Sequence, residues 1–399
     1  MEADSERLNP EWLQGPLRGL LETLNNDGFE AFAVGGCVRD AVMGRPCNDI
    51  DVSTNATPDQ VFNTLYAARW RMVPTGVEHG TWTAVKDRHT FEVTTYRRDV
   101  ATDGRRATIA YADTMNQDAE RRDFTMNALY MDLNGEVYDP TRTGIEDAKA
   151  GRIRFVGDAA TRCREDYLRI LRFYRFNATH GFDNMDKDGM IACEAYAAGL
   201  KDISRERVLM EMQKLLSAVN TRFDNPSTNN AHLWLVLTRM QSHGVLDEVF
   251  PHGHTLYNLF DLLSGESDFG GTNTDWRTRL YTVCGKNVPL PLAKKDRVFV
   301  ETLATLYSNP QTLSLEALAQ VHGMPLAREL GYLRKDDFTG RALQVASEQK
   351  FPVKAVDFMD RGFTQGQELG KAIRQAREFW LHRNMAATRD ECIAAVMGD

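Results

Sequence analysis

The stretch over residues 33–53 decides the fold, and it reads AVGGCVRDAVMGRPCNDIDVS. It starts with a short apolar run that is typical of a buried strand. Gly35-Gly36 follows, and glycines at such a turn let the backbone approach a ligand closely. A helix can then begin near Val38, with Arg39 in its first turn. Because free N–H groups at a helix start bind anions and an arginine adds a forked donor, this turn predicts a phosphate site.

The same stretch ends in Asp49-Ile50-Asp51. In a strand, residues i and i+2 point to one face, so Asp49 and Asp51 would project side by side while Ile50 is buried. Two carboxylates near a phosphate site are what Mg²⁺ needs when it also binds a triphosphate. Taken singly, the glycine pair could be a plain turn and the aspartates a solvated strand face. Their combination in one strand–helix–strand unit favours the functional interpretation.

This segment, GGCVRDAVMGRPCNDIDV, resembles the signature of the polymerase-β-type nucleotidyltransferases, in the branch of class II (bacterial-type) CCA-adding enzymes and poly(A) polymerases. A second segment, RRDFTMNA over residues 121–128, closely resembles the family motif RRDFTxNA. The resemblance implies that Asp49 and Asp51 are catalytic metal ligands. It also implies nucleotide-binding residues: Gly35, Gly36 and Arg39 would hold phosphates, and Arg122 would contact the phosphates or the sugar. Asp123 and Asn127 would fix the ribose and hold the helix against the sheet. Phe124 is expected in the core.

Two further features lie between these motifs. Glu92 sits in an alternating strand-like run, where it is either a solvated strand position or a third catalytic carboxylate beside Asp49 and Asp51. Residues 97–106 read RRDVATDGRR, which lacks apolar periodicity and therefore predicts a loop. A flexible basic loop at this place in the resembling family helps the switch from CTP to ATP. Arg105 and Arg106 would fill that role, and the alternative is a solvated hairpin tip.

A third motif, residues 149–176, resembles the family segment that links the catalytic head to a helical neck. On a helix, Asp166 and Arg169 would be neighbours at i, i+3. A carboxylate can accept from the exocyclic amino group of C or A, and a guanidinium can donate to the adjacent ring nitrogen, whereas G and U present the opposite pattern. The pair could thus select C and A, or be an ordinary surface ion pair. Arg172 and Arg175 continue the face as a basic, nucleotide-binding stripe.

Composition sets broad limits. A chain of 399 residues predicts about two to four domains, and 42% hydrophobic with 26% charged residues is typical of soluble globular proteins. We expect no membrane span and no signal peptide at the start of the chain. Six scattered cysteines without a CxxC motif favour reduced thiols in a cytoplasmic protein, without zinc. The net charge of −8 argues weakly against non-specific nucleic-acid binding, but residues 151–175 carry seven Arg against three acids.

The resemblance implies an α+β fold in the head, a polymerase-β-like palm of mixed sheet and helices, followed by an all-α neck, body and tail. We expect the catalytic head over residues 1–144 and a nucleobase-selecting neck over 145–200. The body would cover 201–285, and a tRNA-binding tail 286–399.

The implied reaction is template-independent addition of C, C and A to the 3′ end of tRNA from CTP and ATP. It would proceed by in-line transfer with two Mg²⁺ ions and release of pyrophosphate. Poly(A) polymerase and CC-adding or A-adding enzymes are alternatives within the family, although residues 74–82, PTGVEHGTW, look more like the CCA-adding pattern. Outside it stand a non-catalytic RNA- or nucleotide-binding protein and a small-molecule nucleotidyltransferase. The intact aspartate pair argues against the first, and the long helical half argues against the second.

Overall fold

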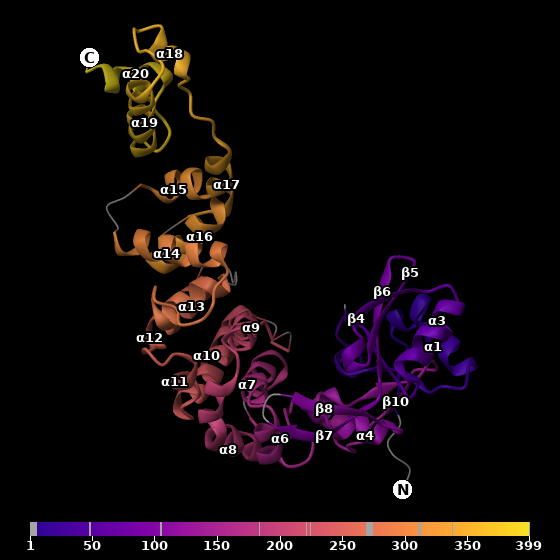
Figure 1. The fold of residues 1–399 in the computed structure, drawn as a ribbon. Helices are drawn as coiled ribbons and strands as arrows, with labels where there is room; N and C mark the ends of the chain where they lie inside the picture. The colour runs from indigo at the N-terminus through magenta and orange to yellow at the C-terminus, as the bar shows by residue number, and fades with distance from the viewer. Residues whose placement is uncertain are drawn as a thin grey trace. The chain divides into compact units, whose positions relative to one another are not determined.

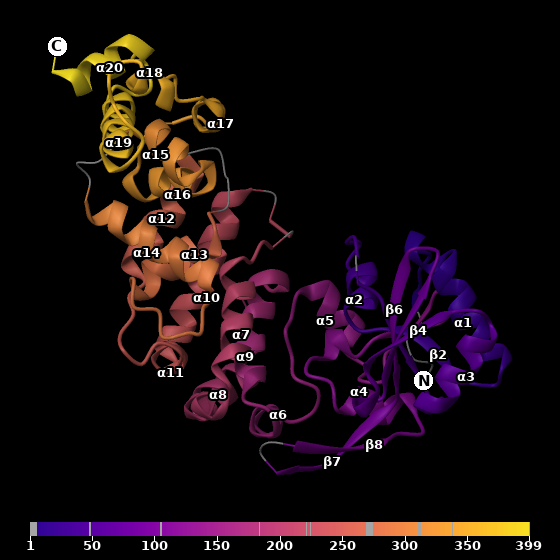
Figure 2. The ribbon, with the colours of Figure 1, turned by 45° about the horizontal axis from the view of Figure 1, so that its top comes forward.

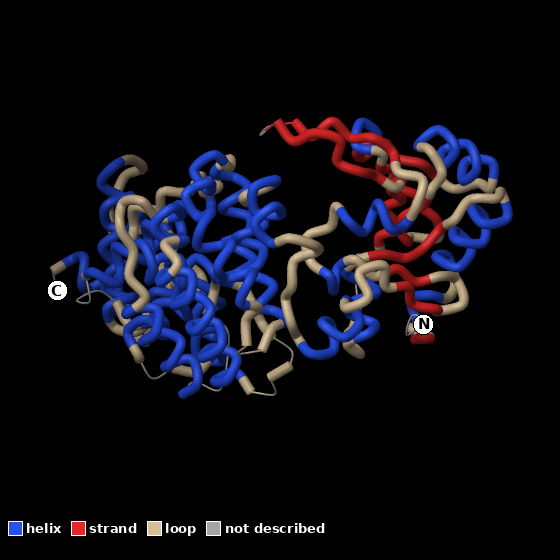
Figure 3. Tube along the Cα trace, turned by 90° about the horizontal axis from the view of Figure 1, so that it is seen from below, coloured by secondary structure: helices blue, strands red, loops and turns tan. Residues whose placement is uncertain are grey.

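The computed structural model describes residues 6–47, 49–103, 106–182, 184–220, 222–223, 225–268, 274–309, 313–336 and 338–398. The chain divides into two compact units, residues 1–223 with 235–249, and residues 224–234 with 250–399. Among the described residues, all strands precede residue 139, and helices make up the ordered elements that follow (Figures 1 and 3). This order confirms the expected α+β head followed by an all-helical part.

An eight-stranded mixed sheet forms the centre of the head, in the order β1-β10-β9-β2-β3-β6-β5-β4. Its strands are β1 Glu6–Arg7, β2 Ala31–Val34, β3 Asp51–Thr54, β4 Arg71–Gly76, β5 Thr81–Lys86, β6 His89–Thr95, β9 Tyr130–Met131 and β10 Glu136–Tyr138. β3 and β6 run parallel, and the other neighbours pair antiparallel. The two strands that carry the candidate carboxylates are therefore adjacent at the middle of the sheet.

Two helices, α1 Pro16–Asn26 and α3 Pro58–Ala67, pack together against the sheet (Figure 2). The helical repeat of α1 puts its leucines on one stripe, and this stripe is fully buried. α3 begins with a capping box in which Thr57 and Gln60 bind each other's backbone N–H groups. Val52 of β3 and Val93 of β6, which are register partners, are also fully buried. Because side chains alternate along a strand, the residues next to these valines point to the opposite face.

Shorter elements complete the head: α2 Gly36–Val42, α4 Met115–Glu120, the 3₁₀ helices η1 Glu11–Leu13, η2 Val77–His79 and η3 Thr125–Asn127, and α5 Gly144–Ala150. The predicted loop at residues 97–106 is wrong in its secondary structure. β7 Arg97–Asp103 and β8 Arg106–Tyr111 pair as an antiparallel ribbon, because pairing of the two segments supplies hydrogen bonds that do not depend on apolar periodicity. Arg105 lies outside the described residues, and only the backbone of Arg106 is described.

Helices α6 Ala159–Glu165, α7 Leu168–His180, α8 Lys187–Tyr196, η4 Ala197–Asp202, α9 Arg205–Leu216, α10 Pro226–Ser242 and α11 Val245–Val249 follow the sheet. An aromatic cluster joins the head to α7. Phe124 lies 4.9 Å from Phe155 between ring centroids, and Phe155 stacks on Phe173 at 5.5 Å. All three rings are buried, which confirms that Phe124 belongs to the core. This packing holds the start of the helical part against the end of the head.

The second unit is helical in its described residues. Its helices are α12 Tyr257–Asp268, α13 Trp276–Cys284, α14 Lys294–Ser308, α15 Leu315–His322, α16 Met324–Arg334, α17 Gly340–Glu348, α18 Ala355–Met359, α19 Gln367–His382 and α20 Arg389–Met397, with the N-terminal part of α10. One core surrounds Leu303 and Leu330, and a second surrounds Trp380 and Phe358. Across the described parts of both units, none of the helices is long and apolar enough to cross a membrane.

Candidate functional site

Asp51 and Glu92 lie side by side on the open face of the sheet. They are register partners in the parallel pair of β3 and β6, and both are exposed. The sequence analysis assumed that Asp49 and Asp51 lie in one strand. In the structure β3 begins at Asp51, so Asp49 lies outside it. β2 ends at Val34, the partner of Asp51, and the chain then turns at Gly35, so residues 49–50 lack a partner strand on that side. Asp49 therefore reaches the site from the segment that leads into β3.

The charges of Glu92 and Asp49 affect the ionisation of Asp51. Loss of hydration raises the pKa of Asp51, and the negative charges of Glu92 and Asp49 raise it further, while the charge of Arg122 opposes them. No salt bridge neutralises Asp49, Asp51 or Glu92 within the part of the chain that the structure describes. The arrangement is a cluster of like charges that a bound cation would relieve.

A divalent cation fits these residues if the substrate completes its ligand set. Among the described residues, no three His, Cys, Asp or Glu side chains converge closely enough to hold a metal ion by themselves. Mg²⁺ seldom uses such a cage, because it keeps several water ligands and is usually bound by one or two carboxylates together with substrate phosphates. Two carboxylates, Asp49 and Asp51, together with the phosphates of a bound nucleotide would meet that requirement.

The glycine turn lies next to Arg122. Gly35 has φ of +78°, a left-handed conformation that glycine adopts without strain. A Cβ atom at Gly35 would also lie 3.2 Å from Nη1 of Arg122, which is a tight contact. α2 begins directly at Gly36, two residues before the expected start near Val38. The absence of a side chain at Gly35 thus lets the guanidinium of Arg122 pack directly against the backbone of the turn.

Arg39 is mostly buried behind this turn, with 7% of its surface exposed. Its Nη1 donates to Oδ1 of Asn127 at 2.8 Å, and its Nε donates to Oδ1 of Asp40 at 2.9 Å. The structure therefore joins two predicted nucleotide-binding residues, Arg39 and Asn127, to each other. In this arrangement Arg39 fixes the start of α2 against η3.

Asp118 organises the arginines of the RRD motif, and the sequence analysis missed it. Arg122 donates to Asp118 at 3.0 Å, Arg121 donates to it at 2.6 Å, and the hydroxyl of Tyr130 donates to it at 2.7 Å. Asp118 is fully buried. Burial alone would raise its pKa, but Arg122 and Arg121 hold the pKa well below the ordinary range. The spacing of Asp118 to these arginines, i+3 and i+4 at the end of α4, was the available signal.

Asp123 links the head to α7. Its carboxylate accepts hydrogen bonds from the backbone N–H of Phe124, from Asn127 and from Arg172. Burial raises the pKa of Asp123, but Arg172 and Asn127 outweigh it and lower the pKa overall. The sequence analysis gave Asp123 two roles, to fix the ribose and to hold a helix in place. In the structure its carboxylate is bound by protein donors, and its contact with the ribose stays a prediction.

The predicted basic stripe on α7 is paired with acids. Arg172 binds Asp123, and its Nη1 lies 3.7 Å from Glu211 of α9. Nε of Arg175 donates to Oε2 of Glu211 at 2.6 Å. Both arginines lie on α7 as expected, but their charges are largely neutralised because Glu211, 36 residues or more along the chain, faces them. Their nucleotide-binding role stays a prediction.

The expected helical i, i+3 arrangement of Asp166 and Arg169 is wrong. Asp166 lies between α6 and α7 with extended backbone angles, φ −152° and ψ 104°. Its Oδ1 accepts from the N–H of Leu168 at 3.1 Å, and its carbonyl accepts from the N–H of Arg169 at 2.9 Å. Oδ2 accepts from Nη2 of Arg207 at 2.7 Å. Aspartate is favoured at helix starts because it satisfies these free N–H groups, so α7 begins after Asp166 instead of including it.

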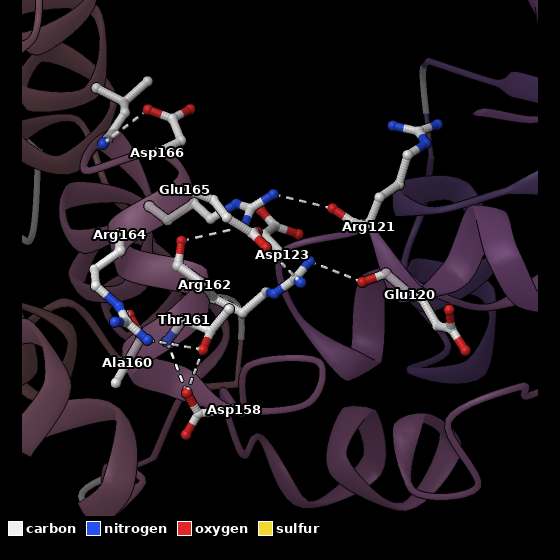
Figure 4. Close-up of polar contacts among 12 residues, drawn as sticks. Glu120, Arg121, Asp123, Asp158, Ala160, Thr161, Arg162, Arg164, Glu165 and Asp166 are labelled. Atoms are coloured by element: carbon white, nitrogen blue, oxygen red, sulfur yellow. Dashed lines mark hydrogen bonds and ion pairs between the residues drawn. The ribbon is translucent and has the colours of Figure 1, made fainter. Parts of the chain in front are cut away.

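Glu165 holds Arg169 and Arg162 against the head. Figure 4 shows Glu165 and Arg162 beside Glu120 and Arg121. Arg169 donates to Oε2 of Glu165 at 2.6 Å and to the carbonyl of Arg121 at 3.0 Å. Arg162 donates to Oε1 of Glu165 at 2.7 Å and to the carbonyl of Glu120 at 2.8 Å. One carboxylate therefore orients two guanidinium groups, each of which also binds the end of α4. The sequence analysis missed Glu165, whose i, i+4 spacing to Arg169 was the signal.

Comparisons with known proteins agree with the motifs. Residues 31–154 match the family model of the poly A polymerase head domain. The chain is 40% identical to the CCA-adding enzyme of Streptococcus gordonii, over 89% of this chain and 90% of that one. It is 32% identical to the mitochondrial CCA tRNA nucleotidyltransferase 1 of Danio rerio, over 95% and 90%. Its fold resembles that of Bacillus stearothermophilus CCA-adding enzyme in complex with CTP, with a TM-score of 0.69, 23% identity and coverage of 96% and 98%.

Proposed function

The chain belongs to the family of CCA-adding enzymes, as its motifs predict, and we propose from this premise that it adds C, C and A to the 3′ end of tRNA. CTP and ATP are the substrates, and pyrophosphate is the leaving group. The observation that carries the proposal is the pair of Asp51 and Glu92, adjacent carboxylates of the central strands that lack a counter-ion in the described structure. This pair stands in a chain that covers nine-tenths of the length of its relatives.

Enzymes of this superfamily generally use a divalent metal, and we assign Mg²⁺ to Asp49 and Asp51, with Glu92 as a third catalytic carboxylate. Support comes from the position of Asp51 beside Glu92 and from the raised pKa of Asp51, which lost hydration raises first and the charges of Glu92 and Asp49 raise further. When bound, the metal supplies Lewis-acid activation of the attacking 3′-hydroxyl and charge neutralisation at the triphosphate.

The residues around the carboxylates position the triphosphate. In the transfer, the 3′-oxygen of the tRNA forms a bond to the α-phosphorus as the bond to the β-phosphate breaks. Arg122 and the Gly35-Gly36 turn, which lie in contact, offer cationic and backbone donors to the phosphates. Asp118 supports this role because it fixes the Arg122 side chain in a buried, charged network.

Asp166 and Arg169 select the base while they remain held by their protein partners. Contacts of Arg169 with Glu165, Arg162 and Arg121 occupy three of the five N–H donors of a guanidinium, so donors remain for a ring nitrogen. Each carboxylate oxygen of Asp166 accepts one of the hydrogen bonds described above and has a second lone pair for an exocyclic amino group. Fixed side chains favour discrimination, because a wrong base then leaves polar groups unpaired.

The domain assignment made from the sequence accompanies this proposal: a catalytic head over 1–144, a neck over 145–200, a body over 201–285 and a tRNA-binding tail over 286–399. Arg172 and Arg175 support the neck, where they orient α7 through Asp123 and Glu211. Arg105 and Arg106 remain assigned to the CTP-to-ATP switch.

The test is extension of a tRNA transcript that lacks its terminal CCA, with Mg²⁺ and CTP, ATP or both. We expect two added residues with CTP alone and a third only when ATP is also present, read by sequencing the product ends. A long ladder with ATP alone would instead identify a poly(A) polymerase. Growth that stops after two C residues with both nucleotides would identify a CC-adding enzyme. No extension under any of these conditions would refute catalysis and favour a binding protein.

A further inference from the structure

A cavity of about 380 Å³ lies among the helices of the second unit. Its wall consists of residues 253–255, the first half of α12, the C-terminal ends of α13 and α16, and Tyr307 near the end of α14. These four helices are neighbours in the fold (Figure 1). Sites for small ligands have volumes of about 300–1,000 Å³, so this cavity has the size of a binding site. It shares no residue with the candidate site of the head.

Tyrosine rings give the cavity flat walls. Tyr281, Tyr307 and Tyr332 all line it. The rings of Tyr281 and Tyr307 lie 6.3 Å apart between centroids at an interplanar angle of 81°, so their planes form a corner. Tyr307 is 42% exposed, and its ring is therefore open to a ligand. A flat ligand in this corner stacks on one ring and meets the other edge-to-face, which are the two arrangements that aromatic rings prefer.

A carboxylate and an ammonium group line the same cavity. Oδ1 of Asp261 lies 3.4 Å from Nζ of Lys335, and both side chains are more than half exposed. A carboxylate has about four lone-pair sites and an ammonium group has three N–H groups, so this one contact leaves acceptors and donors for a ligand. An exposed ion pair contributes little to stability, so stability alone does not account for this pair in the cavity wall.

The backbone of Lys335 is a second indication of a ligand site. This residue ends α16 in the left-handed conformation, with φ +59° and ψ 34°. Glycine is the usual residue there, because a Cβ atom makes the conformation unfavourable. Residues in unfavourable conformations are concentrated at ligand sites, where the side chain has a use that a glycine would not serve. At this position a glycine would remove the ammonium group next to Asp261.

We propose that this cavity binds guanine, presented either by free guanosine or by an unpaired guanine of an RNA. The Watson–Crick edge of guanine has two adjacent donors, N1–H and the N2 amino group, beside the acceptor O6. The Asp261 carboxylate accepts from both donors, and the Lys335 ammonium group donates to O6. The ring system packs in the corner between Tyr281 and Tyr307, as unstacked bases pack on aromatic side chains.

The other bases match this pair of charged groups less fully. Adenine and cytosine each place one amino group beside a ring acceptor, and uracil has a single N–H between two carbonyl oxygens. Each of them offers the carboxylate one donor, whereas guanine offers two. A site built on hydrogen bonds discriminates against a ligand that leaves one of its groups unpaired. Guanine should therefore bind roughly tenfold or more tightly than the other bases.

Titration of the full-length protein with nucleosides, followed by nuclear magnetic resonance of the nucleoside protons, tests the site. Guanosine, inosine and adenosine are compared without Mg²⁺ or triphosphates, so that binding in the head is not favoured. We expect adenosine to bind roughly tenfold or more weakly than guanosine, and inosine, which lacks the N2 amino group, to lie between them. No binding of guanosine at millimolar concentration, or equal binding of guanosine and adenosine, would overturn the proposal.

Three variants locate the binding. Asp261→Asn replaces one carboxylate oxygen with an amino group that opposes the guanine donors, so the preference for guanosine over adenosine should be lost. Tyr307→Leu removes a stacking ring and should weaken guanosine binding by roughly fivefold or more. Glu301→Gln is the matched control, because Glu301 is an exposed acid of α14 outside the cavity wall, and it should bind as the wild type does. An unchanged preference in Asp261→Asn would refute the assignment of guanine to this cavity.

Two short RNAs distinguish the sources of the base. One is a single strand of five adenosines, and the other has guanosine at its centre. Tighter binding of the second RNA than of free guanosine, with the difference between the RNAs lost in Asp261→Asn, would identify RNA as the source. Tighter binding of guanosine than of either RNA would identify the free nucleoside. These binding measurements do not depend on tRNA extension, so they test the cavity whether or not the proposed function holds.

Discussion

In the sheet, Asp51 and Glu92 stand side by side without an ion pair in the described structure, whereas at the junction with α7 Asp123, Glu165 and Glu211 each bind arginine. Both regions contain acidic side chains, but in the sheet these lie beside other acids, whereas at the junction they lie beside arginines. The pKa of Asp51 is raised by lost hydration and like charges, and the pKa of Asp123 is lowered by Arg172 and Asn127 despite its burial.

This difference in charge pairing separates a site that binds a ligand from a network that supports the structure. A cluster of unneutralised carboxylates costs stability and persists where a ligand supplies the missing charge. A network in which each acid has a cation fixes geometry, and its removal leaves a buried charge without a partner. The sheet site is therefore suited to binding a cation, and the ion pairs at the junction fix the position of α7 against the head. Substitutions in the two regions should separate activity from stability.

The largest expected effect is on transfer in Asp51→Asn. The substitution removes a metal ligand worth several kcal/mol of transition-state stabilisation, so tRNA extension should fall by roughly a thousandfold or more. Removal of one of three like charges should leave the free energy of unfolding unchanged or slightly higher. Extension rates and urea unfolding of the same preparation measure both. Normal transfer, or a large loss of stability, would contradict the distinction.

Asp123→Asn should show the converse pattern in stability. Without the carboxylate, Arg172 loses the nearer of its two counter-ions at a mostly buried contact and keeps only Glu211 at 3.7 Å, which should cost about 2–4 kcal/mol of unfolding free energy. Asp113→Asn, at an exposed head position, is the matched control and should change stability by less than about 0.5 kcal/mol. Urea denaturation compares the two. If Asp123→Asn lowers the unfolding free energy no more than Asp113→Asn does, the ion pairs at the junction do not stabilise the protein as proposed.

Asp166→Ala tests base selection, with a smaller expected effect. The substitution removes the acceptor for the exocyclic amino group, so discrimination against UTP and GTP should fall by roughly 10- to 100-fold. Glu165→Gln weakens the hold on Arg169 and should relax selectivity less, since Arg169 retains its contact with the Arg121 carbonyl. Incorporation from each of the four nucleotides is the readout. Unchanged selectivity in Asp166→Ala would show that other groups read the base.

The smallest effect is on the pH dependence of stability. Asp123, whose pKa is lowered on folding, contributes stability that is present above an ordinary aspartate pKa of about 4 and is lost as pH falls below it. Asp51, whose pKa is raised, has the opposite sign: its contribution falls as pH rises above about 4. The stability advantage of Asp51→Asn over wild type should therefore grow from pH 4 to 7, and the deficit of Asp123→Asn should shrink below pH 4. Urea unfolding from below pH 4 up to pH 7 measures, for each variant, how its difference in unfolding free energy from the wild type changes with pH. A change of the same sign for Asp51 and Asp123 would contradict their opposite pKa shifts.

Local patterns predicted the parts of the fold that depend on near neighbours. The buried strand before Gly35 and the glycine turn that leads into a helix follow from the apolar run and from Gly35-Gly36, and both are present. The carboxylates were found because two aspartates at i, i+2 precede a buried run.

The errors arose where distant residues decide the outcome. Asp166 was assigned to a helix because its segment has helical spacing, yet its capping role and its contact with Arg207 end that helix before it. The charges of Arg172 and Arg175 looked available because Asp123 and Glu211 are far away in sequence. The spacing of Asp118 indicates its arginine partners, but its burial against Tyr130, 12 residues along the chain, has no local signal.

The most direct test of the central claim is binding of Mn²⁺, a paramagnetic substitute for Mg²⁺, measured by electron paramagnetic resonance with CTP and without tRNA, so that no transfer occurs. The account predicts that the wild type and Asp113→Asn bind Mn²⁺ in the presence of CTP and that Asp51→Asn loses this binding while it remains folded. Equal binding of Mn²⁺ by Asp51→Asn and wild type would contradict the claim that the open carboxylates of the sheet hold the metal.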